Sequence, residues 1–571
     1  MSHGSALARQ NILRPEDFRT SIFSLLLCTL AINVLSLALP VMTLQVYDRI
    51  LPNPGTGTLP VLVVGVCLAV FLEAGLRLSR AYVIGRSGVS YEHRMACNAM
   101  KRVLFADLTK LSNYGVGQYL QRMGSVGKLK DFYNGYSLTV LIELAFLPIF
   151  LGLIIYIGQW LAIVPVTILA VFSVVSLIQG QKLQTVLKAR EDSDEKRFNF
   201  LIESLEGVHT LKAFALENFF ARRYEDLEER STFDNFKVTQ KTSSLFNTVS
   251  IFSHIMVASV ITAGAWYVLN GYLTTGGLIA ILLLSGRMMQ PVQKAVSLWA
   301  RYQDFKRARD NMTEILTTPQ RAAIERAHPL PILAEGRLNI KDLSFRYNYR
   351  DAPILKNINL DLTHGKSILI SGSHGSGKST LLSLIAGVYL PEAGEILIDG
   401  EDIRTYQPAE LSRHVGFIRS DAIIFRGTIR ENITCFGQID EAQAQEVADL
   451  LHVDREVAQL PGGFDTFLNG NNTDVISPGL KQRIAILRVL ATKPRLILFD
   501  NADRTLDREG YARIYSLLAR LRSRVTMIIV SDDRNLRGLT DEHFTLENGI
   551  LTPNTESYSR GNVRPYKELR L

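Results

Sequence analysis

The stretch KSILISGSHGSGKSTLLSLIAGV, residues 366–388, decides the fold of the C-terminal half. It begins with an apolar run typical of a strand, passes through a glycine-rich segment and ends in an apolar helical run. Its centre has the full spacing G-x-x-x-x-G-K-[ST] of a phosphate-binding loop. The sequence therefore predicts strand, phosphate-binding loop and helix in that order.

Each residue type in this loop has a chemical purpose. Glycines let backbone N–H groups approach phosphates, and the N-terminus of the following helix adds partial positive charge. Lys378 is expected to reach the outer phosphates, and the Ser379 hydroxyl to ligate Mg²⁺. The residues expected to bind ATP are Gly372, Ser373, His374, Gly375, Ser376, Gly377, Lys378, Ser379 and Thr380. The fold expected here is an α/β P-loop NTPase domain.

A second apolar strand, Leu496–Asp500, ends in an acid. In P-loop proteins an acid at this place, called Walker B, holds the magnesium ion. Asp500 and Ser379 are therefore the expected metal ligands, and ATP and Mg²⁺ the expected cofactors.

The N-terminal half is expected to be a helical membrane domain. The chain of 571 residues is 47% hydrophobic, and its mean hydropathy of +0.11 is high for a soluble protein. Six apolar stretches are each near the roughly 20 residues that cross a bilayer as a helix. They run over approximately residues 21–42, 58–79, 137–157, 159–179, 246–269 and 274–296.

Charge indicates the orientation of these spans. The net charge is +8, and residues 80–135 and 180–246 carry nine and eleven Lys or Arg. The other connections between spans carry none, so both long loops, both termini and the ATP-binding domain are expected on the cytoplasmic side. Basic residues placed in this way indicate a membrane protein, and we expect no nucleic-acid partner.

The long loops and the charged residues inside the spans have predicted roles. Residues 80–133 and 181–244 mix apolar and charged residues at helical spacing, which predicts extensions of the membrane helices. They are expected to reverse at 115–127 and 207–210. Glu143 and Arg287 lie within spans, where we expect either a polar translocation path in which the two are paired or a structural salt bridge.

These observations divide the chain into five parts. The expected segments are a cytoplasmic N-terminal segment (1–20), a six-helix all-α transmembrane domain (21–305), a linker (306–335), the ATP-binding domain (336–555) and a basic tail (556–571).

Between the two phosphate motifs the chain resembles the ATP-binding cassette (ABC) transporters. Residues 476–485 read ISPGLKQRIA, where that family has L-S-G-G-Q followed by a basic residue and Q-R. The resemblance implies that Ser477 and Gly479 contact nucleotide, that Tyr347 stacks on adenine and that Asp507 is the D-loop aspartate. Six spans followed by one cassette is the layout of an ABC exporter half-transporter.

The membrane half resembles type I protein secretion exporters. The stretch QVYDRIL at residues 45–51 and LSGR at 284–287, with the later Pro291, carry this likeness. It implies a bacterial inner-membrane protein that exports a polypeptide together with a periplasmic adaptor and an outer-membrane channel.

The sequence departs from the family at four catalytic motifs. The family's catalytic glutamate after the Walker-B acid is replaced by Asn501, which cannot accept a proton, and losing a general base costs roughly 10²–10⁴ in rate. The histidine that contacts the γ-phosphate is replaced by Asp532, a carboxylate that would repel phosphate. The Q-loop glutamine is replaced by Ser420, and the signature has Pro478 and Leu480 in place of a glycine and a glutamine.

These departures predict a catalytically weak subunit. Two nearby acids, Asp503 and Asp533, do not restore the family spacing. ABC cassettes act as head-to-tail dimers, so a non-identical, catalytically complete half-transporter is the expected partner.

The alternatives to a polypeptide exporter are an exporter of peptide, lipid or glycan, and a non-transporting ATP-sensing regulatory subunit.

Overall fold

A computed structural model describes residues 18–52, 57–111, 116–133, 136–320, 335–347, 352–470 and 476–554. The chain forms two compact units, Met1–Ala106 with Ser112–Pro319, and Asp107–Leu111 with Gln320–Leu571. Residues 1–17 of the expected N-terminal segment, 321–334 of the expected linker and the expected tail lie outside the described residues. The first part of that linker, residues 306–317, continues the last helix of the first unit.

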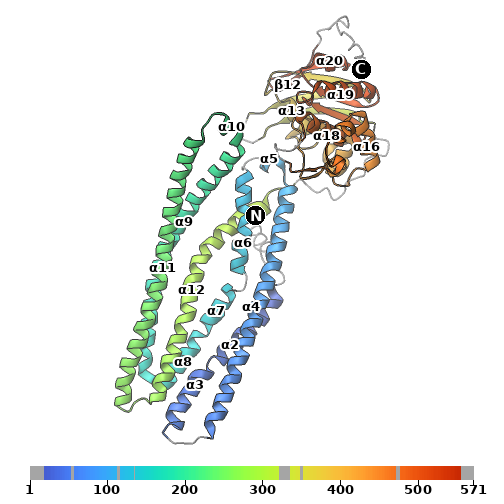
Figure 1. The fold of residues 1–571 in the computed structure, drawn as a ribbon. Coiled ribbons are helices and arrows are strands. Elements are labelled where there is room, and N and C mark those ends of the chain that lie inside the picture. The colour runs from blue at the N-terminus through green and yellow to red at the C-terminus, as the bar shows by residue number, and fades with distance from the viewer. Residues whose placement is uncertain are drawn as a thin grey trace. The chain divides into compact units, whose positions relative to one another are not determined.

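The described part of the first unit is helical (Figure 1). Its elements are α2 (Phe18–Leu35), α3 (Ala38–Gln45), η1 (Val46–Ile50), α4 (Thr58–Leu104), α6 (Val116–Tyr133), α7 (Tyr136–Ala145), α8 (Leu147–Gly158), η2 (Gln159–Ala162), α9 (Ile163–Glu206), α10 (Val208–Ala213), α11 (Glu217–Leu269) and α12 (Thr275–Thr317).

Within the described residues, five helical stretches are long and apolar enough to cross a membrane. The third of them, Thr139–Glu206, contains two of the expected spans, which η2 separates. Gln159 begins η2 with a φ of +45°, and α9 then runs back along the bundle (Figure 1). The six expected spans therefore fall in these five stretches, apart from one or two residues at the start of three spans.

The start of α12 is held by the segment that follows the first span. Asp48 accepts hydrogen bonds from the Gly276 N–H at 2.9 Å and from the Thr274 hydroxyl at 2.6 Å. Thr274 in turn accepts one from the Gly277 N–H at 3.0 Å. Backbone donors at a helix N-terminus need such acceptors, and the helix dipole favours an acid there. The QVYDRIL stretch therefore has a structural role through Asp48.

The long loops extend the membrane helices, as predicted, but the first one reverses earlier than expected. Helix α4 runs without a break to Leu104, and α6 begins at Val116. Gly124 and Gly127 lie inside α6, where a Cβ on either would meet open space, so neither marks a turn. The expected reversal at 115–127 is therefore wrong. The reversal predicted at 207–210 is confirmed, because α9 ends just before Gly207.

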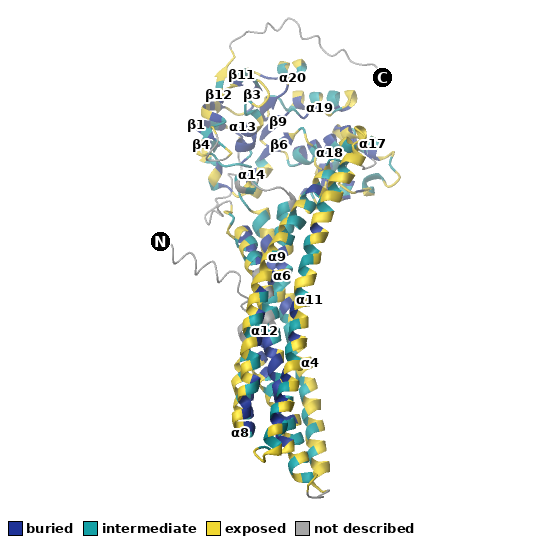
Figure 2. Ribbon diagram, turned by 90° about the vertical axis from the view of Figure 1, so that its left-hand side faces the viewer, coloured by how far each residue is buried: buried dark blue, intermediate teal, exposed yellow. Residues whose placement is uncertain are grey.

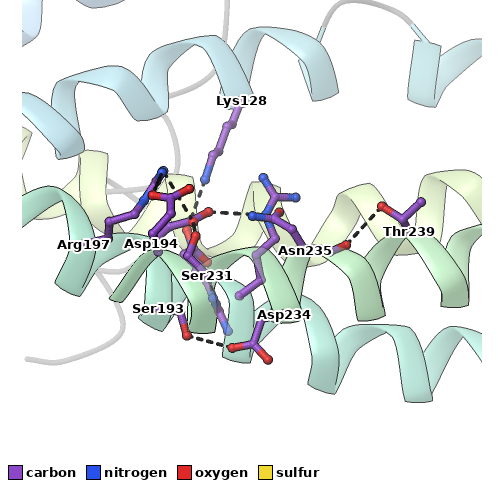
Figure 3. Close-up of polar contacts among 12 residues, drawn as sticks. Lys128, Ser193, Asp194, Arg197, Ser231, Asp234, Asn235 and Thr239 are labelled. Atoms are coloured by element: carbon purple, nitrogen blue, oxygen red, sulfur yellow. Dashed lines mark hydrogen bonds and ion pairs between the residues drawn. The ribbon is translucent and has the colours of Figure 1, made fainter. Parts of the chain in front are cut away.

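Polar contacts join the extended parts of α9 and α11 (Figure 3). The Ser193 hydroxyl donates to Asp234 at 2.8 Å, and the Ser231 hydroxyl donates to Asp194 at 2.5 Å. Lys128 on α6 pairs with Glu191 on α9 at 3.1 Å. Hydrogen bonds and ion pairs, together with apolar packing, therefore stabilise this part of the bundle.

The ionisable residues of the spans pair differently from the expectation. Glu143 is 8% exposed and pairs with Lys294 at 2.7 Å and with Arg80 at 3.6 Å. Glu73 pairs with Arg77 one helical turn away, at 2.5 Å. The suggested pairing of Glu143 with Arg287 is wrong: α12 presents Lys294, two turns further on, to the carboxylate.

The second unit takes in α5 (Leu108–Leu111), and its described residues form three sheets. In the larger sheet the strand order is β12 (Ile550–Pro553), β11 (Glu542–Glu547), β3 (Ser367–Ser371), β10 (Thr526–Val530), β9 (Leu496–Asp500) and β6 (Val415–Arg419). The second sheet has the order β2 (Leu355–Leu362), β1 (Leu338–Phe345), β4 (Ala393–Ile398) and β5 (Glu401–Asp402), and β7 (Gly427–Thr428) pairs with β8 (Phe467–Leu468).

The remaining elements of this unit are helical. They are α13 (Lys378–Ile385), η3 (Ile403–Thr405), α14 (Pro408–His414), α15 (Ile429–Ile433), α16 (Glu441–Leu450), α17 (Val453–Val457), η4 (Gly463–Asp465), α18 (Pro478–Ala491), α19 (Arg508–Leu521) and α20 (Arg534–Gly538). All residues of β9 and β10 are buried, as expected of parallel strands covered on both faces (Figure 2).

We predict that Gly394→Ala destabilises the β1–β4 pairing. Gly394 has a φ of +85°, and a Cβ there would clash with the backbone carbonyl oxygens of Lys341 and Asp342. Gly400→Ala is the matched control, because its φ is +90° but a Cβ would meet open space. Strained backbone of this kind costs about 1–3 kcal/mol, and the clash adds to it only at Gly394. Hydrogen–deuterium exchange of β1 in the full chain should rise more for Gly394→Ala; equal exchange would contradict the prediction.

Candidate nucleotide-binding site

The site lies along one edge of the larger sheet. Strand β10 is parallel to β3 and to β9, with Ile529 opposite Leu369 and Val530 opposite Asp500. Strand β6 is parallel to β9, with Arg419 opposite Asp500. The carboxyl ends of four neighbouring strands therefore meet at the same edge, which is where ligands bind in open α/β sheets.

The predicted catalytic and phosphate residues follow these strand ends. The phosphate loop begins with Gly372 after β3, and Ser420 comes directly after β6. Asp500 ends β9 and Asn501 follows it, while Asp532 lies two residues beyond β10. The structure therefore brings together five positions that the sequence only placed in order along the chain.

The phosphate loop has the backbone shape that its glycines predict. Gly372, Gly375 and Gly377 have φ values of +149°, +80° and +101°, and Gly377 precedes the first residue of α13. The Lys378 ammonium donates to the carbonyl oxygens of Gly372 at 2.7 Å and Ser373 at 2.8 Å. The loop carbonyl groups thus hold the Lys378 ammonium, the cation that phosphate oxygens would contact.

Tyr347 lies beside the helix that follows this loop. Its hydroxyl is 2.9 Å from the Thr380 hydroxyl, and its ring meets that of Tyr389 edge to face at 5.3 Å. Tyr347 as a whole remains 36% exposed. Thr380 is 7% exposed, so its hydroxyl faces Tyr347 inside the protein. Tyr347 is therefore partly accessible to solvent beside the loop.

The residues present fit a bound magnesium ion. Asp500 is 7% exposed at the strand end, and Ser379 is exposed in the first turn of α13. Among the described residues, no group of three His, Cys, Asp or Glu side chains forms a metal cage. Mg²⁺ is commonly held by one or two protein oxygens together with substrate phosphates and water, and the Asp500 carboxylate and Ser379 hydroxyl are of this kind. When bound, the ion would neutralise phosphate charge.

Asn501 has contacts that suit an amide. Its side-chain N–H donates to the Asp500 carboxylate at 3.2 Å, and its backbone N–H donates to the Val530 carbonyl at 2.8 Å. Its φ is +48°, a region in which Asn is favoured over most residues. The amide is thus a donor to the metal-binding acid, and it offers no basic group for a water molecule.

Asp532 is paired with a residue that the sequence analysis missed. Arg504 donates to the Asp532 carboxylate at 2.6 Å. Burial holds the pKa of the Lys378 ammonium below its ordinary value, while Asp532 and Asp500 act to raise it and Arg504 to lower it. Four charged groups therefore act on one another at this edge. The sequence signal for this pairing was a basic residue, Arg504, only four positions after Asp500.

The two neighbouring acids have structural contacts. Asp503 accepts a hydrogen bond from Ser531 at 2.8 Å, and burial raises the pKa of its carboxyl group. Asp533 caps α20 and accepts a hydrogen bond from the Tyr511 hydroxyl at 2.6 Å. These contacts support the expectation that neither acid replaces the missing glutamate or histidine.

The signature residues lie at the start of α18. The Ser477 oxygen accepts the Leu480 N–H at 3.1 Å, and its hydroxyl donates to Glu456 at 3.2 Å. Glu456 also pairs with Arg483, which is 3% exposed. Among the described residues, no hydrogen bond connects Ser477 with Lys378, so one chain does not join its own signature to its own phosphate loop in this way.

The other signature positions are structurally accommodated. Gly479 lies beside Asp507, because a Cβ there would be 3.5 Å from the Asp507 carboxylate, and Asp507 caps α19. Leu480 is 1% exposed in the hydrophobic core, and Pro478 occupies the first turn of α18, where its missing N–H costs nothing. The two substitutions thus stabilise the helix start rather than present polar groups.

The fold and the site define an ABC transporter. Residues 22–292 match the family described as ABC transporter transmembrane region, and residues 355–504 match the family described as ABC transporter. The chain thus carries both parts of such a protein and belongs to the ABC transporters.

Individual ABC transporters are similar to this chain over most of its length. The alpha-hemolysin translocation ATP-binding protein HlyB of Escherichia coli O157:H7 is 27% identical over 538 residues, covering 94% of this chain and 76% of HlyB. The cyclolysin secretion/processing ATP-binding protein CyaB of Bordetella pertussis is 28% identical over 535 residues, covering 93% and 74%. A bacterial Atm1-family ABC exporter with ATP bound has the same fold, with a TM-score of 0.79, 23% identity and 94% of each chain covered.

We predict that Lys378→Ala weakens binding of ATP–Mg²⁺ roughly 10- to 100-fold, since charge-assisted hydrogen bonds contribute about 1.5–3 kcal/mol. Lys366→Ala is the matched control, because Lys366 lies just before β3 and pairs with Glu542 at 3.8 Å, outside the loop. Equilibrium binding to the purified full chain measures both. Equal losses for the two variants would contradict the assigned role of Lys378.

We predict that Asn501→Glu combined with Asp532→His raises ATP turnover at least about tenfold, because it supplies a base and removes a repulsive charge. Asn501→Gln combined with Asp532→Asn is the control, since it alters both sites without adding a base. Turnover of each full-length variant is compared with the unaltered chain. An equal rise in the control would show that the carboxylate at 532, and not the missing base, limits hydrolysis, and no rise in the Glu/His variant would show that these positions do not limit it.

Proposed function

We propose that this chain is the ATP-binding, catalytically weak half of a heterodimeric exporter that moves polypeptide out of the cytoplasm. The observation that carries the proposal is the pair of substitutions at the carboxyl edge. Asn501 donates its amide to Asp500, and Asp532 is bound to Arg504. The Asn501 amide has no basic group that could take a proton from water in the way that a general base must.

ATP binding rests on residues that keep the family pattern. Lys378 and the loop N–H groups hold the phosphates, Asp500 and Ser379 hold Mg²⁺, and the partly accessible Tyr347 stacks on the base. Since the chain contains both binding groups and substituted catalytic groups, it stays occupied by ATP for longer than a complete cassette does.

A non-identical partner subunit would supply the catalytic groups that this chain lacks. In head-to-tail cassette dimers each ATP lies between one phosphate loop and the signature of the other subunit. The partner supplies a complete phosphate loop, glutamate and histidine to one site, and this chain supplies Ser477 and Gly479. Ser477 is already oriented by Glu456 and by its capping contact with Leu480.

Polypeptide export is supported by the relatives, whose names refer to alpha-hemolysin and cyclolysin. We therefore propose a periplasmic adaptor and an outer-membrane channel as further partners. The chain lies in a bacterial inner membrane, with both termini and the ATP-binding domain, residues 336–555, in the cytoplasm. The basic long loops support this orientation.

The proposal is tested by ATP turnover with and without a candidate partner, such as a complete half-transporter encoded beside this chain. We expect the purified chain alone to bind ATP but to turn it over roughly 10²-fold more slowly than the co-purified pair. In the pair, inactivating the partner's catalytic glutamate should abolish turnover, whereas Asn501→Gln in this chain should change it little. Fast turnover by this chain alone, lost in Lys378→Ala, would overturn the proposal.

Two alternatives are separated by the cargo. Deletion of the chain should abolish secretion of a polypeptide, and an adaptor protein should co-purify. Loss of a peptide, lipid or glycan from the exterior, with protein secretion intact, would favour the other kind of exporter. Unchanged export of any cargo on charge reversal at Glu143 would favour a regulatory ATP sensor.

A further inference from the structure

A small cavity of about 40 Å³ lies among the helices of the first unit. Four cationic side chains line it: Arg77 and Arg80 from α4, and Arg287 and Lys294 from α12. Glu143, from α7, is the acid in its lining. A cavity of this size holds a few water molecules or one small polar group.

The acids near the cavity do not balance these cations. Glu143 contacts both Lys294, at 2.7 Å, and Arg80, at 3.6 Å. Arg77 is paired with Glu73 at 2.5 Å. With four cations against these two acids, two positive charges are left over.

Two cations at the cavity are incompletely satisfied. Among the described residues, the buried Nη1 of Arg80 has no close hydrogen bond, and its nearest acid is the Glu143 carboxylate 3.6 Å away. Within the part of the chain that the structure describes, Arg287 has no ion pair or hydrogen bond. Uncompensated cations inside a membrane domain are costly, and functional ones pair with a ligand. The missing partner is therefore an anion, and the planar guanidinium groups suit the paired oxygens of a phosphate.

We propose that this cavity binds the phosphate headgroup of an anionic phospholipid from the cytoplasmic leaflet. Arg77 and Lys294 each lie within three residues of the expected cytoplasmic end of their span, at 79 and 296. Basic pockets between membrane helices on that side are suited to anionic headgroups.

The surface of α4 beside the cavity favours a lipid over a polypeptide. The Arg77 side chain is 53% exposed, so the cavity has a charged group at the protein surface. On the same helix, Phe71 and Leu78 are 78% and 73% exposed. An acyl chain can cover such side chains while its phosphate contacts the arginines. The inference rests on the proposed orientation in the membrane and not on ATP turnover or export.

The test is native mass spectrometry of the full-length chain purified in neutral detergent. Phosphatidylglycerol and phosphatidylcholine with identical acyl chains are added in turn. We expect one phosphatidylglycerol to be retained preferentially, and its apparent affinity to fall about tenfold in Arg80→Gln and Arg287→Gln, since each removes a charge-assisted contact. Arg86→Gln is the matched control, because Arg86 is an exposed cation on α4 outside the cavity.

The variant Glu143→Gln is a control for misfolding, because it is expected to increase lipid retention. It removes the acid that competes for Lys294 and Arg80, so retention of phosphatidylglycerol should rise. A misfolded protein would lose retention instead. Because the readout is lipid mass, its result is independent of ATP turnover and secretion, which test the proposed function separately.

Further outcomes decide the source of the anion. Equal retention of both lipids, or the same loss in Arg287→Gln and Arg86→Gln, would overturn the proposal. Displacement of phosphatidylglycerol by millimolar inorganic phosphate would assign the cavity to the free ion, and displacement by a glutamate-rich peptide would assign it to acidic polypeptide. Either result would overturn a lipid site.

Discussion

The parallel pairing of β10 with both β3 and β9 is the constraint on which the nucleotide site depends. It places the phosphate loop, the Walker-B acid and the segment after β10 at one edge, although more than 150 residues of sequence separate the first from the last. The backbone hydrogen bond from Asn501 to the Val530 carbonyl continues this pairing one residue past β9. Substitutions at these positions therefore change the chemistry of an edge whose geometry the strands set independently.

Charge at this edge is balanced within the chain. Lys378 and Arg504 are cations, and Asp500 and Asp532 are acids. An acid at position 532 alone would repel phosphate, but its pairing with Arg504 offsets that charge. The repulsion expected from the sequence considers Asp532 alone, whereas the structure pairs this acid with Arg504. The loss of a proton acceptor at Asn501 does not depend on this pairing and remains the stronger physical argument against rapid hydrolysis.

What the sequence predicted well was local. The phosphate loop, the strands ending at Asp500 and Val530 and the apolar spans each depend on a short run of residues, so spacing and hydropathy were sufficient. What it missed depends on packing between distant segments. The choice of Lys294 rather than Arg287 as the partner of Glu143 depends on how α12 rotates against α7. Gly124 and Gly127 resemble turn residues in sequence, yet a helix tolerates them at a modest cost.

The contact between Asp48 and the start of α12 has a mechanical consequence. Helix α12 has 43 residues and so extends about 65 Å. Its beginning is bound through the backbone and Thr274 to Asp48, in the segment that follows the first span. Displacement at the Thr317 end, unless Pro291 absorbs it as a bend, must tilt α12 about this attachment and carry the first span with it. The first and last spans of the domain then behave as a single lever.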